Sequence, residues 1–144
     1  MKHRKRILPL LTGVLLLSLM TSVPAQDLPH WPEFHGPDRS NKSTETGLLS
    51  EWPEEGPELL WTVSGLGKGY STVSLADGYI FTSGTGDLQT LVFAYDLEGK
   101  LLWKQPNGGS WETEMSHART YNGARSTPTY DEGVVYHLGD LGRL

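Results

Sequence analysis

The stretch Thr90–Lys104, TLVFAYDLEGKLLWK, gives the clearest indication of the fold. It contains two short apolar runs, Thr90–Tyr95 and Leu101–Lys104, separated by a turn signal at Glu98-Gly99. Such runs are typical of β-strands, and no stretch after Glu58 keeps helical spacing over several turns. The chain is therefore predicted to be all-β. Further runs of the same kind are Leu59–Val63, Tyr70–Leu75, Tyr79–Ser83, Arg125–Tyr130 and Val134–Leu138.

An internal repeat narrows the choice of β architecture. Leu59-Leu60-Trp61 recurs as Leu101-Leu102-Trp103 about 42 residues later, which is the length of one four-stranded propeller blade. The same order continues downstream, and this order predicts a β-propeller of four-stranded antiparallel blades. The recurring pairs are Ser71-Thr72 with Ser126-Thr127, and Gly78–Phe81 with Gly133–Tyr136.

The strands fill such a propeller incompletely. Counted outward from the central channel, the runs between Tyr70 and Lys104 form one complete blade, with a two-residue hairpin at Asp77-Gly78. The two runs after Ala124 form the inner half of the next blade, and Leu59–Val63 is the outer strand of an absent last blade. A ring of about six to eight blades needs roughly 250 to 340 residues. We therefore expect a fragment of a longer protein, or a half-propeller that further copies complete.

The segment Ala94–Trp103, AYDLEGKLLW, resembles the tryptophan-docking motif of pyrroloquinoline-quinone-like (PQQ-like) β-propeller repeats. That motif reads Ala-x-Asp, then a turn with Gly, then an apolar pair ending in Trp. The segment Trp31–Arg39, WPEFHGPDR, is similar to the leader of exported bacterial propellers of this group, with His35 where Arg is commoner. The resemblance extends from Trp31 to Leu144. It implies structural docking roles for Trp61, Asp96, Gly99 and Trp103.

The first 25 residues have the order of a secretory signal peptide. Four basic residues within Lys2–Arg6 precede the apolar run Ile7–Met20, and Val23 and Ala25 are the small residues that signal peptidase needs. We predict cleavage after Ala25, an exported protein in the periplasm or outside the cell, and no stable membrane anchor. The chain has no Cys for a lipid anchor, a disulfide or a thiol nucleophile. Cleavage removes four basic and no acidic residues from a chain of net charge −5, so the mature chain is more acidic still and we expect no nucleic-acid partner.

An arm and a partial propeller follow the signal peptide. Residues 26–58 are rich in Pro and Gly, which do not suit helix interiors or central strands. We interpret them as an extended arm that Trp31, Phe34 and Trp52 attach to the folded body. Residues 59–144 form the partial PQQ-like β-propeller. Pro128 fits its predicted strand because the innermost strand of a blade has a free edge.

One face of the predicted propeller is the candidate binding face. Two kinds of connection lie on the same side of a propeller. One joins the outer strand of a blade to the inner strand of the next blade, and the other joins the second and third strands within a blade. Gly65–Gly69, Gly84–Gln89 and the long insert Gln105–Ala124 should therefore lie together, either as a binding face or as ordinary solvated loops. The candidate binding residues there are Lys68, Asp87, Trp111, His117, Arg119 and Tyr121.

The residues themselves predict no metal or cofactor site. His30, His35, His117 and His137 lack metal-ligand spacing, and Asp87 with Asp140 lacks the oxygen-rich loop of a calcium site.

Three functions are compatible with these patterns. The favoured one is a non-catalytic exported propeller that binds a protein or glycan ligand through its loop face. The resemblance also allows a quinoprotein dehydrogenase, which would use pyrroloquinoline quinone and calcium. A third interpretation is a scaffold of outer-membrane assembly.

Overall fold

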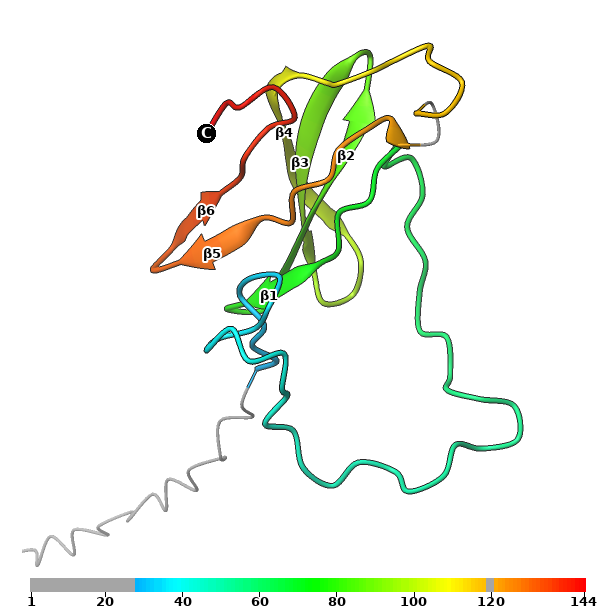
Figure 1. The fold of residues 1–144 in the computed structure, drawn as a ribbon. Coiled ribbons are helices and arrows are strands. Elements are labelled where there is room, and N and C mark those ends of the chain that lie inside the picture. The colour runs from blue at the N-terminus through cyan, green and yellow to red at the C-terminus, as the bar shows by residue number, and fades with distance from the viewer. Residues whose placement is uncertain (1–27, 119–120) are drawn as a thin grey trace, which may run out of the picture.

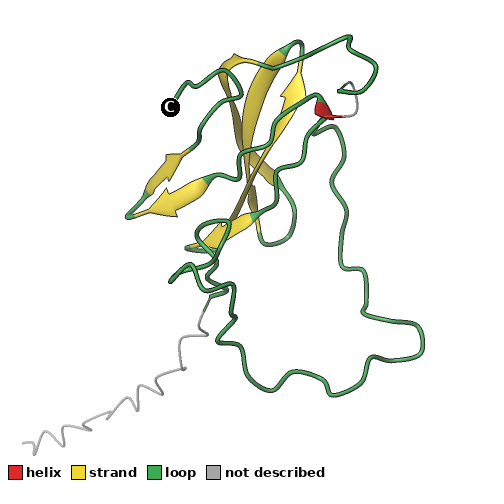
Figure 2. Ribbon diagram, viewed as in Figure 1, coloured by secondary structure: helices red, strands yellow, loops and turns green. Residues whose placement is uncertain are grey.

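The computed structural model describes residues 28–118 and 121–144 (Figure 1). The predicted signal peptide and Arg119 lie outside the described residues. The described ranges form two antiparallel sheets and contain no α-helix; the short red segment in Figure 2 is a 3₁₀ turn at Tyr121. The all-β prediction is confirmed, and neither sheet closes on itself within these ranges.

The larger sheet is a four-stranded meander in the order β1-β2-β3-β4, and the smaller is the hairpin β5-β6. All strand pairs are antiparallel. The strands are β1 (Ser74–Ala76), β2 (Tyr79–Gly86), β3 (Gln89–Asp96), β4 (Leu101–Gly109), β5 (Thr129–Asp131) and β6 (Val134–Tyr136).

The hairpin predicted at Asp77-Gly78 is present. Ala76 pairs with Tyr79, and the two residues between them have φ of 51° and 79°. Two consecutive positive φ values define the type I′ turn, whose twist matches the twist of the flanking strands. Asp77 tolerates this conformation and Gly78 adopts it without steric cost.

The loop expected at Gly84–Gln89 begins later than predicted. Strand β2 continues to Gly86, and the chain reverses one step later at Asp87-Leu88, where φ is 51° and 60°. Gly84 has a different role, because a Cβ there would lie 1.9 Å from the carbonyl oxygen of Leu66. The glycine permits the close approach of two backbones rather than a turn.

Four predicted strand boundaries also need correction. Strand β4 runs to Gly109 rather than ending at Lys104, and Pro106 is compatible with it because β4 is the outer edge of the sheet. The runs Tyr70–Leu75 and Arg125–Tyr130 form ladders only at their C-terminal ends, in β1 and β5. In the segment before β1, a hydrogen bond to a side chain takes the place of strand pairing: the Thr72 N–H donates to Thr127 Oγ1 at 3.1 Å. Strand β6 likewise ends at Tyr136 rather than Leu138.

The predicted strand Leu59–Val63 has no ladder in the structure. Leu59 and Leu60 are each 78% exposed, and no neighbouring strand within the described ranges satisfies their backbone groups. A strand needs a hydrogen-bonded neighbour, so this run is extended without being part of a sheet.

The core lies on one face of the larger sheet. Ile80, Phe93 and Tyr95 form its buried centre. The partly buried side chains packed against this centre are Val63, Leu66, Leu75, Leu91 and Leu97. Other aromatic side chains connect the two sheets: Phe81 of β2 stacks on Tyr130 of β5 at a centroid distance of 5.7 Å and lies 6.1 Å from Trp103 of β4.

The arm contacts the sheets through its first described residues. Trp31 exchanges two backbone hydrogen bonds with Leu75, of 2.7 and 2.9 Å, and the Tyr130 N–H donates to the Pro32 carbonyl at 2.8 Å. Phe34 and Trp52 were expected to attach the arm too, but they are 55% and 70% exposed. After these first contacts the arm runs away from the sheets in a long excursion before it returns to β1 (Figure 1), and residues 37–55 are exposed along it.

The turn between β3 and β4 receives Trp61. The indole Nε1–H donates to the Leu97 carbonyl at 2.9 Å, and the ring covers Gly99 so closely that a Cβ there would lie 2.8 Å from two ring atoms. Asp96 closes the same turn, because its Oδ1 accepts the Lys100 N–H at 2.8 Å. Trp61, Asp96 and Gly99 thus all contribute to the structure of this turn.

Candidate functional site

Three loop segments lie together at one end of the larger sheet. Thr85 is their common point: Gly67 forms a parallel bridge with it, and its Oγ1 accepts the buried Ala124 N–H at 3.0 Å. Close to them, the Ser110 N–H donates to the Leu88 carbonyl at 2.9 Å. The predicted convergence of the loops around Gly65–Gly69, Gly84–Gln89 and Gln105–Ala124 is thus present. We call this region the loop face.

A cavity of about 300 Å³ opens on the loop face, between the segment after β4 and the segment after β6. The Arg125 guanidinium carbon lies 4.9 Å from the centroid of the Trp111 ring, a cation–π distance. The side chains and backbone that line the cavity belong to Trp111, Arg125, Ser126, Leu138, Gly139 and Asp140.

Both charged groups of the cavity are held by backbone groups. Arg125 donates from Nε to the Tyr121 carbonyl at 3.2 Å, and its Nη2 donates to the same oxygen. Asp140 accepts the Trp111 N–H on Oδ2 at 3.3 Å. Arg125 and Asp140 form no ion pair with each other, and the ion pair found within the described ranges joins Arg39 and Glu33 at 2.9 Å. The cavity therefore presents one positive and one negative group, each oriented and neither neutralised by an ion pair.

The structure brings together only part of the predicted binding set. Trp111 lines the cavity, and Tyr121 orients Arg125 through its carbonyl. Lys68, Asp87 and His117 are exposed on the loops, outside the cavity lining.

Sequence reasoning missed Arg125 and, as a cavity residue, Asp140. Arg125 was assigned to a strand, and Asp140 was considered only as a calcium ligand. Arg125 precedes β5 and Asp140 follows β6, so both lie beside short strands at the predicted loop face. This placement in the sequence could have identified them as candidate binding residues. Their shared cavity depends on contacts between segments far apart in the chain.

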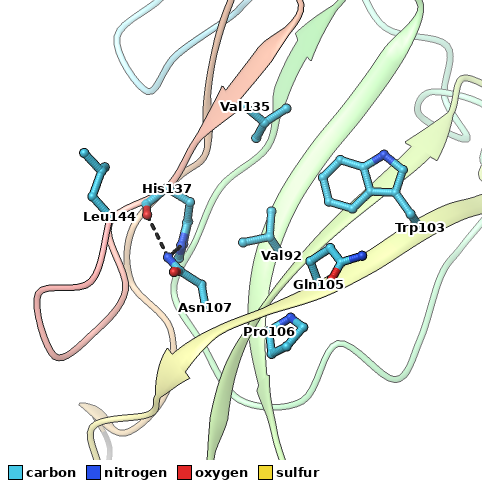
Figure 3. A pocket seen from close by; sticks show the side chains of 8 residues that line it. All are labelled: Val92, Trp103, Gln105, Pro106, Asn107, Val135, His137 and Leu144. Atoms are coloured by element: carbon cyan, nitrogen blue, oxygen red, sulfur yellow. Dashed lines mark hydrogen bonds between the residues drawn. The ribbon is translucent and has the colours of Figure 1, made fainter.

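A second cavity, of about 250 Å³, lies between the two sheets (Figure 3). Its polar groups bind each other: Asn107 Nδ2 donates to Nδ1 of His137 at 2.9 Å and to the His137 carbonyl at 2.7 Å. The His137 Nε2–H donates to the Ser126 carbonyl at 3.2 Å, which makes Nδ1 the acceptor of the neutral ring. Burial lowers the pKa of His137 below its usual 6.5, although the Ser126 bond and Asp140 act in the opposite direction. These polar groups connect the sheets and leave little for a ligand.

The remaining walls of the second cavity are mostly apolar. Trp103 is 37% exposed there, and its indole N–H makes no hydrogen bond to a described residue. The full lining is Val92, Trp103, Gln105, Pro106, Asn107, Val135, His137 and Leu144 (Figure 3).

Neither a metal cluster nor a known relative identifies the function of the chain. Among the described residues, no group of three or more His, Asp or Glu is placed to hold a metal ion. The same part of the chain contains no helix long and apolar enough to cross a membrane. No protein-family model, curated protein or solved structure matches the chain. The proposals below therefore rest on its own residues.

Proposed function

We propose that the chain is part of an exported, non-catalytic β-propeller of PQQ-like repeats that binds a protein or glycan ligand through its loop face. The single observation that carries the propeller is the docking of Trp61 on the β3–β4 turn. In the proposed ring, the segment that carries Trp61 belongs to one repeat and contacts the turn of the next, which is what packing of neighbouring blades requires. The loop-face cavity supports the binding function.

The internal repeat supports the same arrangement around Trp103. Trp103 corresponds to Trp61, and Val135 of β6 corresponds to Ile80 of β2. Ile80 is covered by Phe93 and Tyr95 of β3, whereas Val135 lines an open cavity beside Trp103. A further strand and turn, from the rest of a propeller or from another copy, would fill this cavity and accept the Trp103 N–H.

The hydroxyl groups of Ser71, Thr82 and Ser83 take part in structural hydrogen bonds, which is consistent with a binding role. Ser83 donates to the Ser126 carbonyl at 2.7 Å, and Thr82 donates to the Thr72 carbonyl at 3.0 Å. Ser71 accepts the Ser83 N–H at 3.2 Å. These hydroxyls bond to the backbone, where they hold the sheets and the segment before β1 together.

The test compares ligand binding by two variants of the exported protein. Arg125→Gln alters the loop face, and Glu132→Gln alters the β5–β6 turn at the opposite end of that hairpin. On an array of immobilised glycans and envelope proteins, we expect Arg125→Gln to lose the wild-type ligand and Glu132→Gln to keep it. Equal binding by both variants would contradict the loop-face proposal. Quinone absorbance retained after incubation with pyrroloquinoline quinone and calcium would favour the quinoprotein alternative instead.

A further inference from the structure

The loop-face cavity combines features that restrict the chemistry of its ligand. Its two charged groups, Arg125 and Asp140, have opposite sign, so the cavity has no net side-chain charge. Fixed polar groups in a small cavity orient a ligand and provide specificity, while apolar walls provide contact area. The ligand should therefore be small and neutral, with both donors and acceptors.

The unused hydrogen-bonding capacity of these groups can be counted. Arg125 uses Nε and Nη2 on the Tyr121 carbonyl, which leaves Nη1 without a partner among the described residues. Asp140 accepts the Trp111 N–H on Oδ2, which leaves Oδ1 without a hydrogen-bond partner among the described residues. A guanidinium nitrogen only donates and a carboxylate oxygen only accepts. A ligand that satisfies both must accept a hydrogen bond at one point and donate one at another.

Vicinal hydroxyl groups meet this requirement, because each hydroxyl both donates and accepts. A pyranose ring carries such pairs together with apolar C–H faces. The cavity offers apolar surface for these faces in Leu138, which is 54% exposed, and in the partly buried Trp111. Its volume of about 300 Å³ lies at the lower end of ligand pockets, which suits a single sugar ring.

We propose that the loop-face cavity is a saccharide subsite that takes one neutral pyranose unit, with Asp140 accepting from one hydroxyl and Arg125 donating to another. This inference rests on the proposed binding function and restricts its ligand to a glycan. Arg125 is pre-oriented by the Trp111 ring and the Tyr121 carbonyl, so little side-chain entropy is lost when the sugar binds.

The experiment is a calorimetric titration of the exported protein with the methyl glycosides of glucose, galactose, mannose and N-acetylglucosamine. At least one is expected to bind with a millimolar dissociation constant. Asp140→Asn leaves one acceptor oxygen where the Trp111 N–H and the sugar need two, and Arg125→Gln removes the charged donor. Each should weaken that binding about tenfold or more, because a hydrogen bond to a charged group is lost. Asp131→Asn, an exposed carboxylate at the β5–β6 turn, is the matched control and should leave binding unchanged.

Salt dependence separates a neutral ligand from a charged one. Binding of a neutral glycoside should change less than twofold between low and high salt, whereas charge pairing at exposed groups weakens as salt screens it. Glycine and methyl glucuronide are the charged probes. Stronger binding of either, lost in the same variants, would overturn the neutral-sugar assignment.

Two outcomes separate this inference from the proposed function. If none of the glycosides binds at tens of millimolar, while Arg125→Gln still loses a ligand on the array, the saccharide subsite is wrong and loop-face binding stands. If neither the glycosides nor the array ligands depend on Arg125, both proposals fail. Urea unfolding of each variant establishes that a loss of binding is not a loss of folding.

Discussion

Replacing Gly99 with alanine should destabilise the fold by more than its backbone conformation alone explains. Gly99 has φ of +81°, a region that costs an L-residue roughly 1–2 kcal/mol. The new methyl group would also lie 2.8 Å from the Trp61 ring, so the indole must move. Moving it breaks the 2.9 Å bond to the Leu97 carbonyl, a loss of about 0.5–1.5 kcal/mol. We expect a total cost of about 2–3 kcal/mol in urea unfolding.

Gly133 provides the matched control. Its φ is +87°, yet a Cβ there would meet no atom within 4 Å. Gly133→Ala should therefore show only the conformational cost, about 1–2 kcal/mol. In a Trp61→Ala background the extra cost of Gly99→Ala should disappear, which a double-mutant cycle measures directly. Equal losses for the two glycine variants in the wild-type background would refute the docking contact.

Three further predictions follow from single contacts. Thr85→Val should cost about 1–3 kcal/mol in urea unfolding because it leaves the buried Ala124 N–H without an acceptor, and a smaller cost would mean that another group accepts it. Asp96→Ala should lower the melting temperature through loss of the bond to the Lys100 N–H, worth about 1 kcal/mol, whereas Asp96→Asn should retain most of it. The lowered pKa of His137 means that the unfolded chain takes up the proton first, so stability should fall as the pH drops below 6.5. His137→Gln should reduce that decline in urea midpoints between pH 7.5 and 5.5, and an unchanged slope would contradict the assignment.

Features determined by neighbouring residues could be predicted from the sequence. The hairpin at Asp77-Gly78 needs two positive φ values, and these residue types tolerate them. The turn between β3 and β4 is also determined locally, because Asp96 closes it through a hydrogen bond to Lys100, four residues along the chain. The approximate positions of the β1–β4 strands follow from the same local alternation of apolar runs and turn residues.

Features that depend on distant segments were not predictable in this way. Gly84 has the composition of a turn residue, but its role is set by Leu66, whose carbonyl approaches the strand. Strand β4 continues to Gly109 because β3 provides a long partner, although the predicted run ended at Lys104. Arg125 and Asp140 meet in one cavity only because the segments after β4 and β6 end on the same side.

The contacts of the arm have a consequence for the order of folding during synthesis. Trp31 and Pro32 are synthesised before their hydrogen-bond partners, which are Leu75 in β1 and Tyr130 in β5. The arm must therefore wait, unpaired, while both sheets are made. When it docks, it bonds to the edge of β1 and to the start of β5 at once, so it adds backbone hydrogen bonds to the side-chain contacts that already connect the two sheets. An N-terminal segment made first would thus complete the structure last.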